Sequence, residues 1–460
     1  MNTFSDTIAA IATPPGVGAL GIIRLSGPDT FRIVNDIFYG ADLVKADSHT
    51  IHLGELRNEE GQVLDEALTF LFKGPKSYTG EDVIEISCHG SSYILQEVLD
   101  LCLRKGARPA DPGEFTLRAF LHGRMDLTQA ESVADLIASD NASSHAVAMQ
   151  QMRGGISSEI KKLRQELIDF AALIELELDF SEEDVEFANR DALRKLILKI
   201  QKLIAALLES FRLGNAIKQG VNTVIAGRPN AGKSTLLNAL LQEERAIVSE
   251  VPGTTRDTIE EVLHIKGIAF RLIDTAGIRE AEDQVEAIGV QKTMTKIAES
   301  SILVYVFDVT DLRPEAVTAD MARLHRPGLR ILAVANKMDR YPYAEPSSYA
   351  SEYLPAEDII AVSAKNQMNL AYLKDRLYEA VVHEDLLLEN PIVTNIRHVH
   401  ALQKASESLD AVLAGLDQGI THDFIAMDIR QSLHHLGEIT GEISTDDLLD
   451  SIFSRFCIGK

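Results

Sequence analysis

The sequence predicts a multidomain fold of the α/β and all-α classes, in which one α/β domain interrupts a helical bundle and another precedes it. A chain of 460 residues exceeds what one hydrophobic core usually holds. Strand-length apolar runs alternate with helical stretches in two regions, and amphipathic helical stretches flank the second region. We therefore expect four segments, at residues 1–120, 121–217, 218–383 and 384–460.

The first segment has a mixed α/β pattern. Short apolar runs at Ala19–Leu25, Ala67–Phe72 and Val83–Cys88 indicate strands, and Gly-Pro pairs separate them. The pattern at Ser92–Leu103 indicates a helix. We expect one α/β domain to end near residue 120.

The second and fourth segments carry one apolar stripe per helix, because apolar residues recur there at steps of three and four. The simplest interpretation joins both stretches into one discontinuous bundle with residues 218–383 inserted in a surface loop, since insertion is tolerated where chain ends lie close together. Two separate small bundles are the alternative. The stripes are Ile160, Leu163, Leu167, Phe170, Ile174 and Leu178; Leu193, Leu196, Ile200, Leu203, Leu207 and Phe211; Val399, Leu402, Leu409, Val412 and Leu416; and Ile425, Ile429, Leu433 and Leu436.

The third segment alternates buried runs with helical stretches. The runs read VNTVIAG, AFRLIDTAG, SILVYVFDVTD, RILAVANKMD and DIIAVSAK. Continuous apolar runs separated by helices predict a mostly parallel, doubly wound sheet.

Composition narrows the classes of partner. Hydrophobic residues make up 45% and charged residues 25%, which is typical of a soluble globular protein. The net charge of −24 argues against a broad electrostatic grip on nucleic acid. No apolar run approaches the roughly 20 residues of a membrane helix, so we expect no membrane partner. The three cysteines, Cys88, Cys102 and Cys457, form no disulfide framework or metal motif, and a cytoplasmic location is expected.

A phosphate-binding loop is predicted at residues 227–234. The letters GRPNAGKS match G-x-x-x-x-G-K-[ST] between a predicted strand and a predicted helix, which is the context the motif requires. Backbone N–H groups at such a helix start cradle phosphates. Lys233 would reach the β- and γ-phosphates, and the Ser234 hydroxyl would bind Mg²⁺. The phosphate-binding residues expected here are Asn230, Ala231, Gly232, Lys233, Ser234 and Thr235.

Three further motifs follow in the order of a Ras-like G domain that binds GTP. DTAG offers Asp274 to Mg²⁺ through water and the Gly277 N–H to the γ-phosphate. In NKMD, the Asp339 carboxylate can accept two hydrogen bonds from guanine, which adenine cannot donate. The residues expected to bind the base are Asn336, Lys337 and Asp339 of NKMD, and Ser363, Ala364 and Lys365 of SAK.

Hydrolysis needs a group that orients water and a positive charge near the γ-phosphate. Ile278 stands after DTAG, where Ras-like GTPases have Gln, so another residue must orient the water. Glu286 is the candidate; an ordinary solvated Glu is the alternative. The Asn230 amide could ligate a monovalent cation, or it could be a mere loop residue. In the switch-I-like GTTRD, Thr255 would complete the Mg²⁺ shell.

Motifs along the whole chain resemble those of the MnmE (TrmE) family of tRNA-modification GTPases. In the third segment they are GRPNAGKS, PGTTRD, DTAG followed by an apolar residue, NKMD and SAK. The resemblance also includes DTI from Asp6, ATPPG, RLSG from Arg24, YTGED from Tyr78, PGEF from Pro112, Ala130-Glu131 and the final FCIGK.

The resemblance implies an N-terminal domain that binds folate and dimerises, a discontinuous helical domain and an inserted G domain. It implies K⁺-stimulated GTP hydrolysis coupled to G-domain dimerisation. Asn230 would ligate K⁺, and Ser249, Val251 and Thr254 fall in the loop that wraps the ion. Glu286 matches the family's water-orienting carboxylate. Together with Thr255, Ser249 and Thr254 would also border the bound GTP.

The resemblance further implies a homodimer that forms a heterotetramer with a flavoprotein, MnmG, which alone would bring FAD and NADH. Together they would add a 5-carboxymethylaminomethyl-type group to the wobble uridine of tRNA, with the methylene supplied by 5-formyl- or methylene-tetrahydrofolate. A more basic partner holding most of the tRNA would suit the charge of −24. The alternatives are a regulatory or ribosome-assembly GTPase that acts by switch-controlled binding, and a scaffold that controls its partner.

By motif match, the folate pocket would use Arg24, Glu81, Arg124 and Lys460. A pterin edge needs a carboxylate and a folate tail needs cations, although each residue could equally be a surface ion. Cys457 is either a reactive thiol beside the folate or a small structural hydrophobe.

Three minor features complete the sequence. A helix before Cys457 is expected to be opened by Ser444, with Asp447 three residues on. Cys88 and His89 should point to opposite faces of one strand, so they form no catalytic dyad. The pair His434-His435 is expected to be one surface and one core residue of a helix rather than a metal site.

Overall fold

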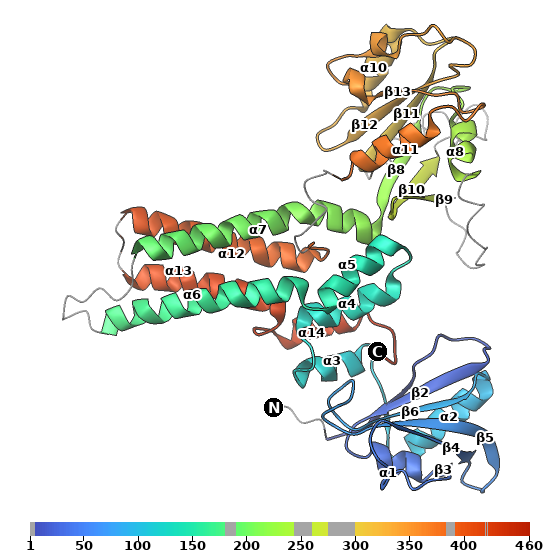
Figure 1. The fold of residues 1–460 in the computed structure, drawn as a ribbon, viewed down its shortest axis with the longest axis vertical. Helices are drawn as coiled ribbons and strands as arrows, with labels where there is room; N and C mark the ends of the chain where they lie inside the picture. The colour runs from blue at the N-terminus through green and yellow to red at the C-terminus, as the bar shows by residue number, and fades with distance from the viewer. Residues whose placement is uncertain are drawn as a thin grey trace, which may run out of the picture. The chain divides into compact units, whose positions relative to one another are not determined.

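The computed structural model describes residues 5–179, 190–242, 260–274, 300–382, 392–418, 420 and 422–460. The chain divides into two compact units, each described by itself below (Figure 1). The first comprises Met1–Ala138, Met149–Gln201 and His400–Lys460; the second comprises Ser139–Ala148 and Lys202–Val399. None of the described helices is both long and apolar enough to cross a membrane.

The first unit begins with a seven-stranded sheet in the order β3-β4-β5-β6-β2-β1-β7, antiparallel except between β1 and β7. The three strands predicted from sequence are confirmed as β2, β5 and β6, and the predicted helix as α2. The elements are β1 (Ile8–Ile11), β2 (Leu20–Ser26), α1 (Thr30–Asn35), β3 (Phe38–Tyr39), β4 (Thr50–Arg57), β5 (Val63–Phe72), β6 (Val83–His89), α2 (Ser92–Arg104), β7 (Arg108–Pro109) and α3 (Glu114–Leu121).

The two faces of this sheet differ. Alternation along the strands sends Ile23 and Ile86 into a core that α2 completes with Val98. On the opposite face Leu53 and Leu68, which are cross-strand partners on β4 and β5, stay exposed. Among the described residues, this second face is covered at β1, where Ile8 and Ala10 pack with Phe115, but it is open around Leu53 and Leu68.

The helical part of the first unit packs segments from both ends of the sequence together. Helix α6 contacts α13, and Arg164 on α6 donates to the Leu433 carbonyl at 3.2 Å. Helix α7 is tied to α12 by the hydrogen bond from Gln201 to Asp410 at 2.6 Å. The discontinuous bundle is thus confirmed (Figure 1). Three of the helices, α5, α7 and α12, also contribute residues to the second unit. The helices are α4 (Leu127–Ala138), α5 (Ala142–Met152), α6 (Gly155–Asp179), α7 (Arg190–Gln219), α12 (Ile396–Gln418), α13 (His422–Thr440) and α14 (Asp446–Phe453).

The N-cap of the last helix, α14, lies one residue later than the sequence predicts. Thr445, not Ser444, is the N-cap of α14, and its side chain accepts a hydrogen bond from the Leu448 N–H at 3.3 Å. Both residue types cap helices well, so sequence alone did not distinguish them. The chain then reaches the start of α3, where the Gly113 N–H donates to the Cys457 carbonyl at 3.4 Å.

The second unit contains a six-stranded sheet in the order β13-β12-β11-β8-β10-β9, in which only β9 is antiparallel. Two hydrophobic clusters cover its faces, as expected for a doubly wound sheet. The elements are β8 (Val221–Ala226), α8 (Lys233–Gln242), β9 (Glu260–Ile265), β10 (Ile268–Asp274), β11 (Ile302–Asp308), α10 (Pro314–Leu324), β12 (Arg330–Asn336), β13 (Ile359–Ala361), α11 (Leu370–Glu379) and the 3₁₀ turns η2 (Pro346–Tyr349) and η3 (Ala356–Asp358).

The beginning of α5 belongs to this second unit. Val147 joins the cluster that holds Ile265 and Ile268 of the β9–β10 hairpin. The hairpin turn has positive φ at Lys266 (48°) and Gly267 (83°), and Ser143 packs so closely that a Cβ on Gly267 would lie 2.0 Å from its Oγ. Helix α5 therefore runs from a contact with this hairpin into the first unit.

Candidate functional site

The four nucleotide motifs lie at the carboxyl ends of neighbouring strands. The phosphate loop follows β8, and Asp274 ends β10 beside it; NKMD follows β12, and SAK follows β13 beside that. Ligands of open α/β sheets bind at this edge, where helix N-termini and strand ends converge. The sheet order thus places the phosphate and base motifs side by side at the carboxyl ends of the strands.

The phosphate loop is held at both of its ends. Gly227 lies against β11 so tightly that a Cβ would approach the Val306 carbonyl oxygen to 2.0 Å. Lys233 is buried, and its ammonium donates to the carbonyls of Gly227 and Arg228, both at 3.0 Å. Asn230 has a left-handed conformation, with φ of 62°, which Asn tolerates better than most residues. Ser234 and Thr235 are exposed at the start of α8.

Asn336 joins three motifs. Its amide nitrogen donates to the Ala231 carbonyl at 2.8 Å, and its amide oxygen accepts from the Ala364 N–H at 3.0 Å. The side chain is buried, so these bonds replace water. Asn336 therefore braces the site instead of presenting its amide to solvent.

Asp339, the predicted base-binding residue of NKMD, is an exposed carboxylate. It accepts a hydrogen bond from the Ser363 hydroxyl at 2.6 Å, and this bond, the largest cause, lowers the pKa of the Asp339 carboxyl. It is therefore ionised at neutral pH, as recognition of two guanine N–H groups requires. Lys337, at φ 66°, pairs with Asp308 at 2.6 Å, and Lys365 is exposed.

Several predicted site residues lie outside the described part of the chain. These are Ser249, Val251, Thr254, Thr255, Gly277 and Glu286, and only the backbone of Asp274 is described.

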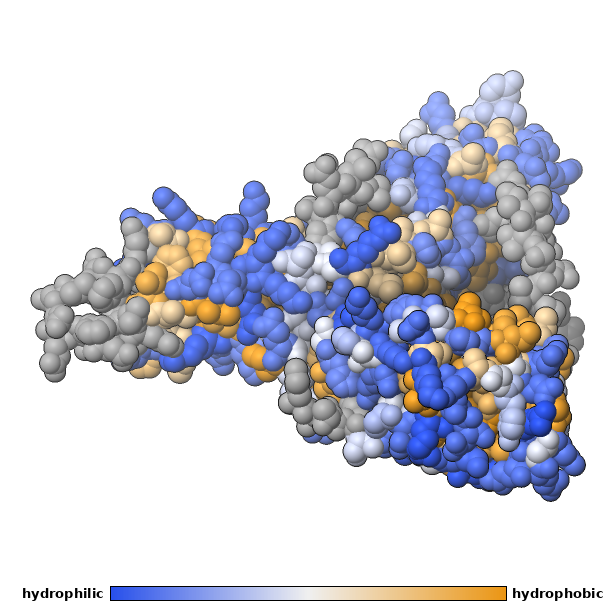
Figure 2. Space-filling model, turned by 60° about the horizontal axis from the view of Figure 1, so that its bottom comes forward, coloured by the Kyte–Doolittle hydropathy of each residue, from blue (hydrophilic) through white to orange (hydrophobic). Residues whose placement is uncertain are grey.

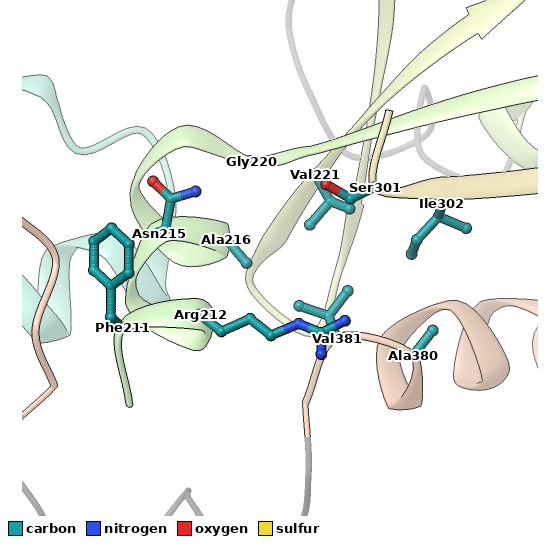
Figure 3. Close-up of a pocket in the computed structure, with 10 residues that line it drawn as sticks. All are labelled: Phe211, Arg212, Asn215, Ala216, Gly220, Val221, Ser301, Ile302, Ala380 and Val381. Atoms are coloured by element: carbon teal, nitrogen blue, oxygen red, sulfur yellow. The ribbon is translucent and has the colours of Figure 1, made fainter. Parts of the chain in front are cut away.

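A cavity of about 260 Å³ occurs at the amino-terminal ends of the strands of this sheet (Figure 3). It lies beside Val221 and Ile302, the first residues of β8 and β11, and Figure 3 shows the Arg212 side chain extended toward Val381. The nucleotide motifs stand at the carboxyl ends of the strands, so this cavity is separate from the nucleotide site.

Arg24 occupies the centre of the second predicted site. Its guanidinium lies 5.3 Å from the Tyr78 ring centre and 5.7 Å from that of Phe115. It pairs with Glu85 at 2.8 Å and donates to the Gly459 carbonyl at 3.1 Å, which joins β2 to the C-terminal tail. Stacking and charge together favour a flat, anionic ligand here.

Lys460 lies close to Arg24. Burial, and then the neighbouring Arg24 charge, lower the pKa of the Lys460 ammonium. Its backbone carbonyl accepts from the Phe115 N–H at 3.2 Å. The structure thus holds two of the predicted folate-site cations close together.

Glu81 is held by groups the sequence did not point to. The Ser26 hydroxyl donates to it at 2.6 Å, and Arg118 donates to both carboxylate oxygens at 3.2 Å. Ser26 lies two residues from Arg24 on the same face of β2. The structure therefore brings Glu81 to the face that carries Arg24.

Arg118 is the main residue that sequence reasoning missed. It is fully buried and also pairs with Asp6 and Glu114, each at 2.9 Å. Its position in a helix, four residues after Glu114, was the only sequence signal. The fourth predicted folate residue, Arg124, is exposed and its Cγ lies 3.5 Å from where a Cβ on Gly80 would be.

The three cysteines differ in accessibility. Burial raises the pKa of Cys88 to about 11 and that of Cys102 to about 12, so both stay protonated. Cys457 is exposed in the tail beside Arg24 and Lys460. Cys88 is buried whereas the next residue, His89, is exposed and bonds Asp65 at 2.7 Å, which confirms their opposite directions.

The two adjacent histidines of α13 are exposed and half-buried respectively, close to the expected surface-and-core pair. Both approach Glu438, with His434 Nε2 3.4 Å and His435 Nδ1 3.3 Å from its carboxylate oxygens. One carboxylate therefore links both rings.

The GRPNAGKS, DTAG and NKMD motifs, which stand at the carboxyl ends of strands of one mostly parallel sheet, define a guanine-nucleotide-binding P-loop protein. Family models agree and go further. "GTP-binding protein TrmE N-terminus" matches residues 7–124, and "MnmE helical domain" matches residues 127–457. The chain belongs to the MnmE family of tRNA modification GTPases, and it is a GTP-hydrolysing enzyme of tRNA modification.

Curated relatives match over the full length. "tRNA modification GTPase MnmE" of Cytophaga hutchinsonii is 54% identical over 460 residues, which are 100% of this chain and 99% of that protein. The protein of the same name from Christiangramia forsetii is 52% identical over 99% of both chains. Among solved structures, a single-residue variant of Aquifex aeolicus Era bound to GDP·AlF4⁻ is 25% identical and covers 41% of this chain and 66% of that one, with a TM-score of 0.27. Such a score does not establish a common fold over the whole chain.

Proposed function

We propose that this GTPase is stimulated by K⁺ and acts with an MnmG-type flavoprotein to form 5-carboxymethylaminomethyl-type wobble uridines in tRNA, using a reduced folate. The observation that carries the modification chemistry is the pair of neighbouring cations, Arg24 and Lys460, beside the Tyr78 and Phe115 rings. Glu85 balances only one of these two charges, so the pair keeps a net positive charge that suits a carboxylate of a folate tail.

In the folate site we assign a role to each residue. Arg24 and Lys460 would bind the tail and Arg124 would add a third cation. Glu81, held by Ser26 and Arg118, would accept from the pterin edge. Bound folate would supply the one-carbon unit, and the exposed Cys457 thiol would meet that unit.

In the nucleotide site, Ser234 and Thr255 would ligate Mg²⁺, with Asp274 acting through water. Asn230 would ligate K⁺, together with Ser249, Val251 and Thr254, and Glu286 would orient the attacking water. A bound K⁺ would supply positive charge beside the γ-phosphate. The left-handed Asn230, fixed between two anchored loop positions, supports its part in this assignment.

The K⁺ assignment is tested by hydrolysis of GTP in KCl and in NaCl. Asn230→Gly removes the amide without backbone strain, because Gly accepts positive φ. We expect wild type to be faster in KCl and the variant to lose that preference. Asn238→Ala, an exposed position on α8, should behave like wild type. Equal rates of wild type in both salts would refute the assignment.

The folate assignment is tested by binding of 5-formyltetrahydrofolate to the whole protein. Arg24→Ala should weaken binding at least about tenfold, since it removes a charge-assisted contact. Arg32→Ala, at an exposed arginine on α1, is the control. Equal affinity of Arg24→Ala and Arg32→Ala for 5-formyltetrahydrofolate would contradict the assignment of Arg24 to the folate site.

We also propose a homodimer formed through the exposed face of the N-terminal sheet. Leu20, Leu53 and Leu68 are exposed there, and Figure 2 shows hydrophobic surface on this domain. The N-terminal sheet of a second copy is the proposed occupant. Leu53→Glu should shift sedimentation to the monomer, whereas Leu198→Glu on α7 should not; a dimer unaffected by Leu53→Glu would place the interface elsewhere.

The complete reaction is tested in cells. Mass analysis of wobble uridines should show loss of the modification in cells that lack this protein, and an intact modification would contradict the proposal. Complementation with Cys457→Ser then decides whether the thiol has a chemical role. A cytoplasmic location and the MnmG-type partner, which would bring FAD and NADH and hold most of the tRNA, belong to the same proposal.

A further inference from the structure

Arg228, the second residue of the phosphate loop, has its side chain bound to a helix. Its guanidinium donates to both oxygens of Asp320 on α10, Nε to Oδ2 at 2.9 Å and Nη2 to Oδ1 at 3.2 Å. Such a two-point contact fixes orientation as well as distance. The loop is therefore tied to a helix whose partner residue lies 92 positions away in sequence.

Asp320 is itself fixed from the other side. The Tyr305 hydroxyl on β11 donates to Asp320 Oδ2, and the Tyr305 side chain is buried in the sheet. Although burial acts to raise it, the pKa of the Asp320 carboxyl is lowered overall by hydrogen bonds from Arg228 and Tyr305. Asp320 is thus a charged acceptor between a rigid strand and the phosphate loop.

The Arg228–Asp320 contact holds a residue whose backbone also makes hydrogen bonds within the phosphate loop. The Arg228 carbonyl accepts from the Lys233 ammonium at 3.0 Å and from the Ala231 N–H at 3.4 Å. At the far end, Asn336 holds the Ala231 carbonyl at 2.8 Å. Only Pro229 and Asn230 lie between the two anchored positions, so the place of Arg228 limits where Asn230 and Lys233 can lie.

We propose that Asp320, supported by Tyr305, is a positioning residue for GTP binding and hydrolysis, and that it acts by anchoring Arg228 and with it the phosphate loop. It is not among the residues assigned above to nucleotide or metal. Its effect is to preorganise the loop before nucleotide binds, which reduces the conformational freedom that binding must remove.

The inference predicts the size and kind of effect. The Arg228 side chain is about half exposed, so the anchor is a moderate interaction. Releasing it should speed dissociation of a fluorescent GDP analogue about three- to tenfold. Dissociation of GDP is measured without K⁺-dependent turnover, so failure of the K⁺ assignment would leave this result interpretable.

The experiment compares Asp320→Asn, Arg228→Ala and the double variant in the full-length protein. We expect both single variants to release the GDP analogue faster and the double variant to add little, because both remove one interaction. Tyr305→Phe should act in the same direction with a smaller effect. Glu315→Gln, at an exposed acid of the same helix, is the control for charge loss on α10.

Thermal unfolding of each variant separates positioning from folding. Arg228 is partly exposed, so Arg228→Ala keeps the test open even if Asp320→Asn unfolds. Faster release with an unchanged melting temperature supports the inference. Release at the wild-type rate in Arg228→Ala, or strictly additive effects in the double variant, would overturn it.

Discussion

The amide nitrogen of Asn336 donates to the carbonyl oxygen of Ala231 at 2.8 Å, which joins the guanine motif to the phosphate loop. The amide oxygen of the same side chain accepts from the Ala364 N–H. Loops that follow three different strands are thereby held together by one buried side chain. The site is braced from within the protein, before any ligand contributes.

Replacing Asn336 with Ala should damage both stability and binding. The buried Ala231 carbonyl and Ala364 N–H would lose their partner, which costs about 2–4 kcal/mol for the two groups. We expect a matching loss in the free energy of unfolding of the nucleotide-binding unit and faster release of GDP. Urea unfolding and a fluorescent GDP analogue measure these, with Asn238→Ala as control; an unchanged midpoint and release rate would contradict the bracing role.

The charge on Asp339 predicts a pH dependence for guanine binding. Its pKa is lowered by the Ser363 hydrogen bond, so the carboxylate is lost only as pH falls through a value below its usual one of about 3.9. Titration of Asp339 should therefore not change GDP affinity between about pH 5 and 8. Asp339→Asn should weaken GDP and favour xanthosine diphosphate, whose 2-oxo group can accept from the new amide; titration with both nucleotides tests this, and an unaltered preference for GDP would refute the assignment.

The close contact between Ser143 and Gly267 can be tested with a matched glycine. Gly267→Ala introduces both backbone strain, at φ 83°, and a Cβ 2.0 Å from Ser143 Oγ. Gly328→Ala has the same strain, at φ 84°, but open space around it. We expect Gly328→Ala to cost about 1 kcal/mol and Gly267→Ala clearly more.

Ser143→Gly should recover part of the loss in Gly267→Ala, because it removes the atoms that collide. Chemical unfolding of wild type, Gly267→Ala, Gly328→Ala and the double variant Ser143→Gly/Gly267→Ala measures these differences in the free energy of unfolding. Equal costs at the two glycines would show that α5 does not press on the hairpin.

Arg108 predicts how acid affects the N-terminal domain. It donates to Asp6 at 2.9 Å and to Glu114 at 2.6 Å. Burial acts to raise the pKa values of both carboxyls, but these contacts and those of Arg118 lower them overall. Carboxyls with lowered folded pKa values stabilise the fold above their unfolded values of about 4, and that contribution is lost as pH falls through the folded values.

Arg108→Gln should therefore destabilise the domain by about 1 kcal/mol at pH 7, a modest figure because Arg108 is partly exposed. The difference from wild type should shrink toward about pH 3. Thermal unfolding between pH 3 and 8 measures it, with Arg104→Gln on α2 as control. A difference that does not change with pH would mean that packing, not charge, is lost.

The elements and motifs were largely predictable from the sequence. Helical and strand periods are local properties, so the stripes at Ile160 and Leu402 and the run at Val83 predicted elements that the structure contains. The phosphate loop is also local, because one short segment between a strand and a helix contains all of its groups. The MnmE resemblance extended this to the family.

Only the tertiary structure decided which distant residues meet. Asp320 reaches Arg228, and Arg118 gathers Asp6 and Glu81, although nothing in the spacing of these residues marks the contacts. The position of a charged residue in the sequence does not reveal its partner, because a solvent-exposed charge and a paired charge give the same sequence pattern.

The sequence by itself determined that this chain binds and hydrolyses GTP, because the atoms that recognise the nucleotide sit in short contiguous motifs. The tertiary structure decided how those motifs are held. It placed the C-terminal tail at β2 through the contact from Arg24 to Gly459, and it packed the start of α5 with the nucleotide-binding unit. These relations depend on chain topology, which brings together residues that no local pattern connects.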